Sequence, residues 1–199
     1  MGWEIFECLA KKYDKWYDAN PHLFQKEVNC LRELIPQNAK KCLEIGVGTG
    51  RFAEKLGIKY GLDPSLNMLK LAKGRCDNLI RGDGAQLPIK SLSFDCVLMI
   101  ATLCYLDYPE KVLEEIRRVL KDDGFLIVCI FPAESGLGKE YIKKGERGHP
   151  IYSLATFYKL KDAEKLIEKF GFKIEKINTT KIFLSENDFT CIKARKLKN

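Results

Sequence analysis

Apolar residues along the chain follow two spacings, which predict helices and strands in turn. In residues 4–18 and 21–35 they recur at helical spacing, and Asn20-Pro21 separates these two segments. From Lys41 onward, short apolar runs alternate with helical segments. The runs predict strands at 42–47, 60–63, 79–81, 94–101 and 125–131, and the segments between them predict helices at 51–56, 65–73 and from Pro109 to Leu120.

The last third of the chain departs from this alternation. Residues 132–152 hold several glycines among charged residues, which favours an irregular insertion with a short helix near 139–144. Such long loops are often lids or binding loops, although a surface loop without a role fits equally well. An amphipathic helix follows at 161–170, and 172–183 and 189–197 predict a closing antiparallel hairpin.

The order of these elements predicts the fold class. Strands that alternate with helices indicate an α/β protein with a mainly parallel sheet and helices on both faces. The length of 199 residues suits a single domain. With 46% hydrophobic and 31% charged residues, the composition is that of an ordinary globular protein.

Cysteines and the first residues bear on the cellular compartment. The chain has eight cysteines and no C-x-x-C pair, so a zinc ribbon is not expected, and no metal site is predicted. Cys42, Cys96, Cys129 and Cys191 lie in apolar runs, where cysteine acts as a small buried hydrophobe. The first residues have neither the basic nor the apolar segment of a signal peptide, so secretion is not expected, and no apolar run approaches the roughly 20 residues that span a bilayer. We therefore expect a reducing, cytoplasmic location.

The net charge of +7 bears on possible partners. Lysines are spread along the whole chain, and the densest basic cluster is the tail at residues 193–198. A basic balance permits a nucleic-acid partner. A solvated, lysine-rich surface explains the same charge, and we favour this second interpretation.

The clearest chemical signal is the glycine-rich run Leu43-Glu44-Ile45-Gly46-Val47-Gly48-Thr49-Gly50. Glycines at alternate positions after a short strand allow a tight turn and a close approach of backbone N–H groups to a nucleotide-like ligand. Arg51 stands where a dinucleotide-binding loop has its third glycine. Arg51 and Glu44 together favour S-adenosylmethionine over NAD as the ligand. An NAD-dependent oxidoreductase remains the third alternative function.

Three acidic residues follow three successive predicted strands: Glu44, Asp63 and Asp83. Because ligands bind at the carboxyl ends of parallel strands, we expect these carboxylates to meet the glycine loop in one crevice. Asp63 can accept ribose hydroxyls, Asp83 an adenine amine, and Glu44 can supply negative potential for a cationic cofactor. Alone, Asp63 before Pro64 could be only a turn former or helix cap.

At these residues the chain resembles class I S-adenosylmethionine-dependent methyltransferases. It is most similar to their small-molecule branch, the methyltransferase type 11 group that includes ubiquinone and menaquinone methyltransferases. The resemblance covers roughly residues 39–175 and implies a Rossmann-like, doubly wound sheet of seven strands, with order 3-2-1-4-5-7-6 and strand 7 antiparallel. The matching segments are Leu43–Gly50, Gly61–Ser65, Gly82–Pro88, Ser93–Val97 and Glu114–Leu126.

The resemblance also implies a division of the chain. Residues 1–36 would be a helical lid, 37–132 the cofactor-binding core, 133–152 a substrate loop, and 153–199 a closing helix and strand hairpin. It implies that S-adenosylmethionine is bound and S-adenosylhomocysteine released. The implied contacts are Glu44, Gly46 and Gly48 at the methionine moiety; Asp63 at the ribose; Pro64, Met68, Asp83, Gly84 and Ala85 around the adenine; and Ile100 and Ala101 at the methionine end.

An aromatic cluster in the first helical segment resembles the lid helix of this branch. Tyr13, Trp16 and Tyr17 can cover the sulfonium, partly through cation–π attraction. They can equally be a helix face packed on the core. With the 133–150 loop, this segment is expected to define the acceptor pocket.

The expected reaction is methyl transfer by in-line displacement to an unidentified, small-molecule acceptor. Relatives often carry histidines after strand four, but this chain has Thr102-Leu103-Cys104-Tyr105 there. Tyr17, Tyr105 and His149 are weak candidates for a base, and His149 fits an exposed loop residue as well. Two alternatives stay open: an RNA methyltransferase, and a cofactor-binding protein without transfer activity. The oligomeric state is not predicted.

Overall fold

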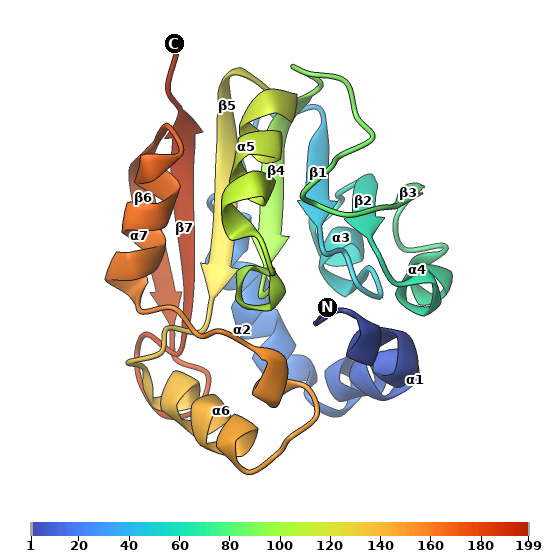
Figure 1. Cartoon of the computed structure of the whole chain (residues 1–199), viewed down its shortest axis with the longest axis vertical. Coiled ribbons are helices and arrows are strands. Elements are labelled where there is room, and N and C mark those ends of the chain that lie inside the picture. The colour runs from blue at the N-terminus through green and yellow to red at the C-terminus, as the bar shows by residue number, and fades with distance from the viewer. Residues whose placement is uncertain (1, 199) are drawn as a thin grey trace.

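A computed structural model describes residues 2–198 of the chain (Figure 1). Seven strands form one sheet in the order β3-β2-β1-β4-β5-β7-β6. Strand β7 runs antiparallel to both of its neighbours, and the other strands are parallel to one another. The predicted fold class is confirmed. The strands are β1 Cys42–Ile45, β2 Tyr60–Asp63, β3 Asn78–Arg81, β4 Phe94–Ile100, β5 Leu120–Ile130, β6 Phe172–Thr180 and β7 Phe189–Lys196.

Helices cover both faces of this sheet. Apolar side chains of α5 and α7 pack with one face, and those of α2 and α3 pack with the other. The buried run of β4 lies between these two layers, as expected for a strand covered on both sides. The helices are α1 Glu4–Ala19, α2 Pro21–Arg32, α3 Arg51–Leu56, α4 Leu66–Ala72, α5 Pro109–Val119, α6 Gly136–Glu146 and α7 Leu160–Lys169, with 3₁₀ turns η1 Leu103–Tyr105 and η2 Tyr152–Leu154.

Two helices lie beyond the carboxyl ends of the parallel strands. In Figure 1, α1 lies below β1 and β2, and α6 lies below β5 and β6. These helices come from the beginning of the chain and from the segment after β5. The edge of the sheet where ligands bind in open α/β folds is therefore enclosed by segments outside the core.

The insertion at residues 132–152 is more regular than expected: the helix predicted near 139–144 forms, but it is longer and becomes the 11-residue helix α6. Its glycines allow close packing. A Cβ atom on Gly138 would lie 1.9 Å from the carbonyl oxygen of Pro132. Ser135 caps the helix by accepting a hydrogen bond from the amide of Gly138 at 2.9 Å. Glycine composition alone did not distinguish this packing from a loop.

The predicted closing hairpin forms, but its first strand ends at Thr180 instead of 183. Buried Asp188 turns the backbone there, because its Oδ2 accepts hydrogen bonds from the amides of Phe183 and Leu184 at 2.8 and 2.6 Å. This local side-chain bonding competes with the strand ladder.

Two buried cysteines differ from the expectation that they are free. Cys129 and Cys191 are direct partners in the register of β5 and β7, and their sulfurs form a disulfide. The strand pairing that brings them together was not visible in their spacing. The other six cysteines are free. Within residues 2–198, no helix is long and apolar enough to cross a membrane.

Candidate functional site

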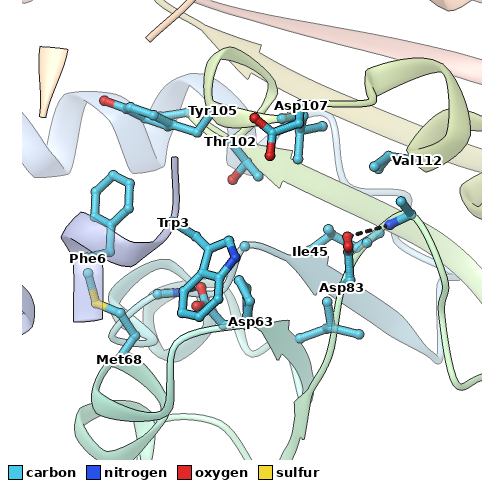
Figure 2. Close-up of a pocket in the computed structure, with 18 of the residues that line it drawn as sticks. Trp3, Phe6, Ile45, Asp63, Met68, Asp83, Thr102, Tyr105, Asp107 and Val112 are labelled. Atoms are coloured by element: carbon cyan, nitrogen blue, oxygen red, sulfur yellow. Dashed lines mark hydrogen bonds between the residues drawn. The ribbon is translucent and has the colours of Figure 1, made fainter. Parts of the chain in front are cut away.

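A cavity of about 150 Å³, the first cavity, opens at the carboxyl ends of β1, β2 and β4 (Figure 2). Backbone turns and strand-end carboxylates form much of its wall. Most of the residues that the sequence assigns to the cofactor lie there, and no lysine or arginine is among its lining residues. The predicted residues in the lining are Tyr13, Gly46, Gly48, Asp63, Pro64, Met68, Asp83, Gly84, Ala85, Ile100 and Ala101.

The glycine loop between β1 and α3 needs its glycines for two different reasons. Gly46 and Gly48 have positive φ angles of 73° and 52°, which other residues adopt at a cost. A Cβ on Gly46 would also lie 2.4 Å from the Oγ1 of Thr102, whereas one on Gly48 would meet nothing within 4 Å. The loop thus approaches the end of β4 closely at Gly46 and remains open at Gly48.

Asp63 is held at the end of β2 by backbone amides. Its Oδ2 accepts from the amide of Gly48 and its Oδ1 from that of Ser65, both at 2.9 Å. The residue is 7% exposed, and burial raises the pKa of its carboxyl to about 6. Each oxygen keeps a second lone pair, so the group can also accept ligand hydroxyls from the cavity.

The other two acids occupy different positions. Asp83 lines the first cavity, and its Oδ1 accepts a hydrogen bond from the amide of Ala85 at 2.9 Å, drawn as a dashed line in Figure 2. Glu44 is 1% exposed and is not among the lining residues. Its Oε2 has no hydrogen-bond partner among residues 2–198. Burial and the nearby Asp63 raise the pKa of Glu44 well above its usual range.

These residues fit a cationic adenosyl cofactor. Asp63 offers acceptors for ribose hydroxyls, and Ile45, Leu62 and Met68 offer apolar side chains for contact with an adenine. A polyanionic dinucleotide would need basic groups or free amides, yet the lining has no lysine or arginine and the Gly48 amide already binds Asp63. The orphaned Oε2 of Glu44 adds a buried acceptor close to this wall.

Several lining residues were not predicted from the sequence. Trp3 precedes α1, and Figure 2 shows its indole pointing into the cavity on the side of Asp63. Phe6 contacts the ring of Tyr105, with centroids 4.9 Å apart. Nothing in the local pattern marks these positions, since they reach the cavity only through the placement of α1. The other unpredicted residues are Ile45, Leu62, Thr102, Leu106, Asp107, Tyr108 and Val112.

Ion pairs fasten α1 over the glycine loop. Asp14 contacts Arg51 at 2.7 Å and Arg75 at 2.7 Å. Burial alone would raise the pKa of Asp14, but hydrogen bonds from these guanidinium groups hold it well below its usual range. Arg51, which stands in place of the third glycine of a dinucleotide loop, therefore connects the loop to α1. Glu7 forms a second connection, to Ser65 and Asn67 of the α4 N-terminus.

A second cavity of about 220 Å³ lies beside the first. The two share Tyr13, Ala101 and Tyr105. Trp16 and Tyr17, which the sequence assigns to the cofactor, line the second cavity and not the first. Its lining comes from α1, α2, α3, η1, α6, η2, the start of β7 and the connecting loops: Leu9, Lys12, Tyr13, Trp16, Tyr17, Glu27, Phe52, Ala101, Cys104, Tyr105, Phe131, Tyr141, His149, Pro150, Ile151, Tyr152, Phe157 and Phe189.

The three candidate bases differ in their surroundings. Burial raises the pKa values of Tyr17 and Tyr105, so their hydroxyls keep their protons at neutral pH. His149 lines the second cavity, and its Nδ1 accepts from the amide of Ile151 at 3.3 Å. Burial and nearby lysines lower the pKa of His149, which keeps its ring neutral. Its Nε2 is the nitrogen that this bond leaves available.

Comparison with known proteins gives a consistent family. A family model described as "Methyltransferase domain" matches residues 43–128. A crystal structure of a Thermotoga maritima S-adenosylmethionine-dependent methyltransferase, described as a possible histamine N-methyltransferase, superposes with a TM-score of 0.89. It is 35% identical to this chain, and the match covers 98% of this chain and 99% of that one.

Two further relatives are similar in sequence. A protein of Methanocaldococcus jannaschii is 38% identical over 184 residues, which are 92% of this chain and 87% of the relative. A protein of Mycobacterium tuberculosis is 39% identical over 167 residues, 83% of this chain. This chain covers only 59% of that mycobacterial relative.

Proposed function

The chain belongs to the S-adenosylmethionine-dependent methyltransferases, and from this membership we propose that it methylates a small molecule held in the second cavity. Its cofactor is S-adenosylmethionine, which supplies a methyl group already activated by a sulfonium. The observation that carries the proposal is the wall of Tyr13, Ala101 and Tyr105 that the two cavities share. An acceptor in the second cavity would lie directly beside a cofactor in the first.

The chain's own residues would then act mainly by binding and by excluding water. We assign the ribose to Asp63, the adenine to the surface around Met68 and Asp83, and the methionine end to the glycine loop and Ala101. Helix α1, fastened through Asp14, would cover the reacting groups. Positioning and desolvation of this kind can supply most of the rate of a transfer whose leaving group is already activated.

The second cavity favours a small acceptor over a nucleic acid. Its wall is largely aromatic and is formed by segments from both ends of the chain. Nucleic-acid sites instead combine a basic groove with aromatic platforms open to a long strand. Only Lys12 and His149 are basic in this lining. We also propose a cytoplasmic location, supported by six free cysteines, although the Cys129–Cys191 pair is an exception.

Cofactor binding by the first cavity is tested with Asp63→Ala. Removal of the carboxylate should weaken S-adenosylmethionine binding at least tenfold, about 1.4 kcal/mol, in calorimetry. Asp77→Ala is the control, because Asp77 is an exposed aspartate just before β3. A folded Asp63→Ala variant with unchanged affinity would remove Asp63 from the site.

Transfer is tested by the release of S-adenosylhomocysteine from the wild-type protein with candidate acceptors. We expect release that depends on an added small molecule and is lost in Asp63→Ala. If the cofactor binds but no acceptor gives release, the chain is a cofactor-binding protein without transfer activity.

A further inference from the structure

A buried carboxyl group in the second cavity has no partner within the protein. Glu27 lies on α2 and is 4% exposed. Neither a hydrogen bond nor an ion pair joins its carboxyl to any residue between 2 and 198. It contributes the only acidic side chain to the lining. Its helix neighbours Phe24, Val28 and Leu31 are buried apolar residues, so an apolar side chain would suit the same helix face.

This arrangement is unfavourable for the protein alone. A carboxylate taken out of water without a partner loses its hydration and gains nothing in return. The consequence is visible in its titration, because burial raises the pKa of Glu27 to about 8. An acid that destabilises the empty protein and faces a cavity indicates a ligand that supplies the missing partner.

The other residues of the lining indicate the sign of the charge on that ligand. Tyr13 and Tyr17 donate and accept through a hydroxyl pair 2.8 Å apart on α1. Tyr152 stacks on Tyr141, with centroids 4.2 Å apart. The faces of such rings carry negative potential and attract ammonium groups. Aromatic faces around one unpaired carboxylate match a cation with an apolar body, and they disfavour an anion.

We propose that the methyl acceptor is a small organic amine whose ammonium group binds Glu27 among the tyrosine rings of the second cavity. This rests on the proposed function, since it assumes that the second cavity receives the acceptor. For transfer, the bound nitrogen first loses a proton to water. Its lone pair then forms the bond to the methyl carbon as the bond from that carbon to the sulfonium sulfur breaks, which leaves S-adenosylhomocysteine. Glu27 is a binding residue for the ammonium form in this proposal. The two basic side chains of the lining do not supply the missing partner: Lys12 is exposed, and desolvation keeps the ring of His149 neutral.

The first test compares amines with neutral molecules of the same shape. Calorimetry with S-adenosylhomocysteine present would measure three pairs: benzylamine and benzyl alcohol, 2-phenylethylamine and 2-phenylethanol, and tryptamine and tryptophol. We expect at least one amine to bind at least tenfold more tightly than its alcohol. If no amine exceeds its alcohol, the proposal is overturned. This comparison needs no variant.

The second test removes the charge of Glu27. Glu27→Gln keeps the size of the side chain and should lower the affinity for the preferred amine at least tenfold, with cofactor affinity unchanged within twofold. Glu33→Gln is the matched control, because Glu33 caps the same helix and its side chain is 72% exposed. Equal amine affinity in wild type and Glu27→Gln would overturn the proposal.

Proton release gives a readout that a merely structural role would not produce. Alkylammonium groups are protonated at neutral pH, as in lysine with a pKa of about 10.4. At pH 7 the empty Glu27 carboxyl holds a proton, and pairing with an ammonium should release about one proton. Calorimetry in buffers of different ionisation enthalpy would detect it in wild type and not in Glu27→Gln. The other charged or titratable groups that line the same cavity are Lys12, Tyr13, Tyr17, Cys104, Tyr105, Tyr141, His149 and Tyr152.

Failure of this inference can be distinguished from failure of the proposed function. Amine binding that depends on Glu27, without release of S-adenosylhomocysteine, would support the amine site and contradict methyl transfer to those amines. Release with a neutral acceptor and no preference for amines would support the proposed function and overturn the amine site.

Discussion

The first and second cavities share a wall, but different parts of the chain build them. The first takes its shape from turns after β1, β2 and β4, where backbone amides fix Asp63 and glycines allow close approach. The second takes its shape from side chains of α1 and α2 and of α6 and η2, two pairs of elements that lie more than 100 residues apart in the chain. A site formed by the backbone is suited to a cofactor that many enzymes have in common. A site formed by side chains is suited to an acceptor that differs from one enzyme to another.

Helix α1 contributes residues to the walls of both cavities. Its residues Phe6 and Tyr13 face the first cavity, and Tyr13, Trp16 and Tyr17 face the second. Asp14 fastens the helix to Arg51 in the glycine-loop region. The helix beside the second cavity is therefore anchored to the wall of the first, so that binding in one cavity can stabilise the wall of the other.

The largest effect, on the free energy of unfolding, should follow from a change to the backbone turn of the first cavity. Gly46→Ala places a methyl group against Thr102 at a positive φ. We expect the free energy of unfolding to fall by about 2–5 kcal/mol, because the backbone term is about 1–2 kcal/mol and crowding adds about 1–3 kcal/mol. Urea denaturation measures this loss, and cofactor affinity should fall with it.

Gly48→Ala is the matched control for this change. Gly48 also has a positive φ, but its added methyl would meet nothing within 4 Å. Only the backbone term of about 1–2 kcal/mol should remain. Equal losses for the two variants would show that the close approach to β4 does not shape the first cavity.

The first cavity could be predicted from the sequence better than the second, because local turns form the first and side chains from distant helices form the second. The turn at Gly46 and the acids at Asp63 and Asp83 follow their strands directly, so a local pattern revealed them and strand order placed them together. Glu27 has no such pattern, because a single acid on an amphipathic helix normally faces water. Its burial depends on how α2 packs against α1, α3, β6 and β7, which only tertiary packing determines.

The sequence predicted that aromatic residues of α1 lie at the site, but it did not predict which cavity each of them lines. The aromatic residues of α1 indicated a cover, but the pattern could not divide them between two cavities. Trp3 lies outside the periodic segment and was missed altogether. In α6, Gly138 suggested a loop although it serves close packing against Pro132. Glycines and aromatic residues have roles that depend on their neighbours in space.

An intermediate effect is expected from pH, and it should act on the first cavity. Asp63 has a pKa near 6, so below this pH it gains a proton and loses acceptor capacity. Affinity for S-adenosylmethionine should fall about tenfold between pH 7.5 and pH 5. Asp63→Asn should abolish most of this dependence in calorimetry. Glu7 and Glu44 lie within the electrostatic reach of Asp63, so the observed midpoint belongs to the group.

The stability of the empty protein should change with pH in the opposite direction. The folded pKa of Asp63 is raised, so the folded state binds more protons than the unfolded state between about pH 4 and 6. Its contribution to stability is fully present below this interval and is lost as pH rises through about 6. Parallel loss of affinity and of stability on acidification would assign the pH effect to general unfolding instead of Asp63.

The smallest effect, on kcat/KM, is expected from a substitution in the second cavity. Tyr152→Leu removes the ring that stacks on Tyr141 and His149, with centroid distances of 4.2 and 4.4 Å. Single aromatic contacts contribute about 0.5–1.5 kcal/mol, so kcat/KM for the preferred amine should fall about 3–10-fold. Cofactor affinity should not change, because Tyr152 does not line the first cavity. Phe183→Leu is the control, as Phe183 is 53% exposed and outside both linings. A matching loss of cofactor affinity in Tyr152→Leu would mean that the two cavities form one cooperative site, in which the acceptor wall also holds the cofactor.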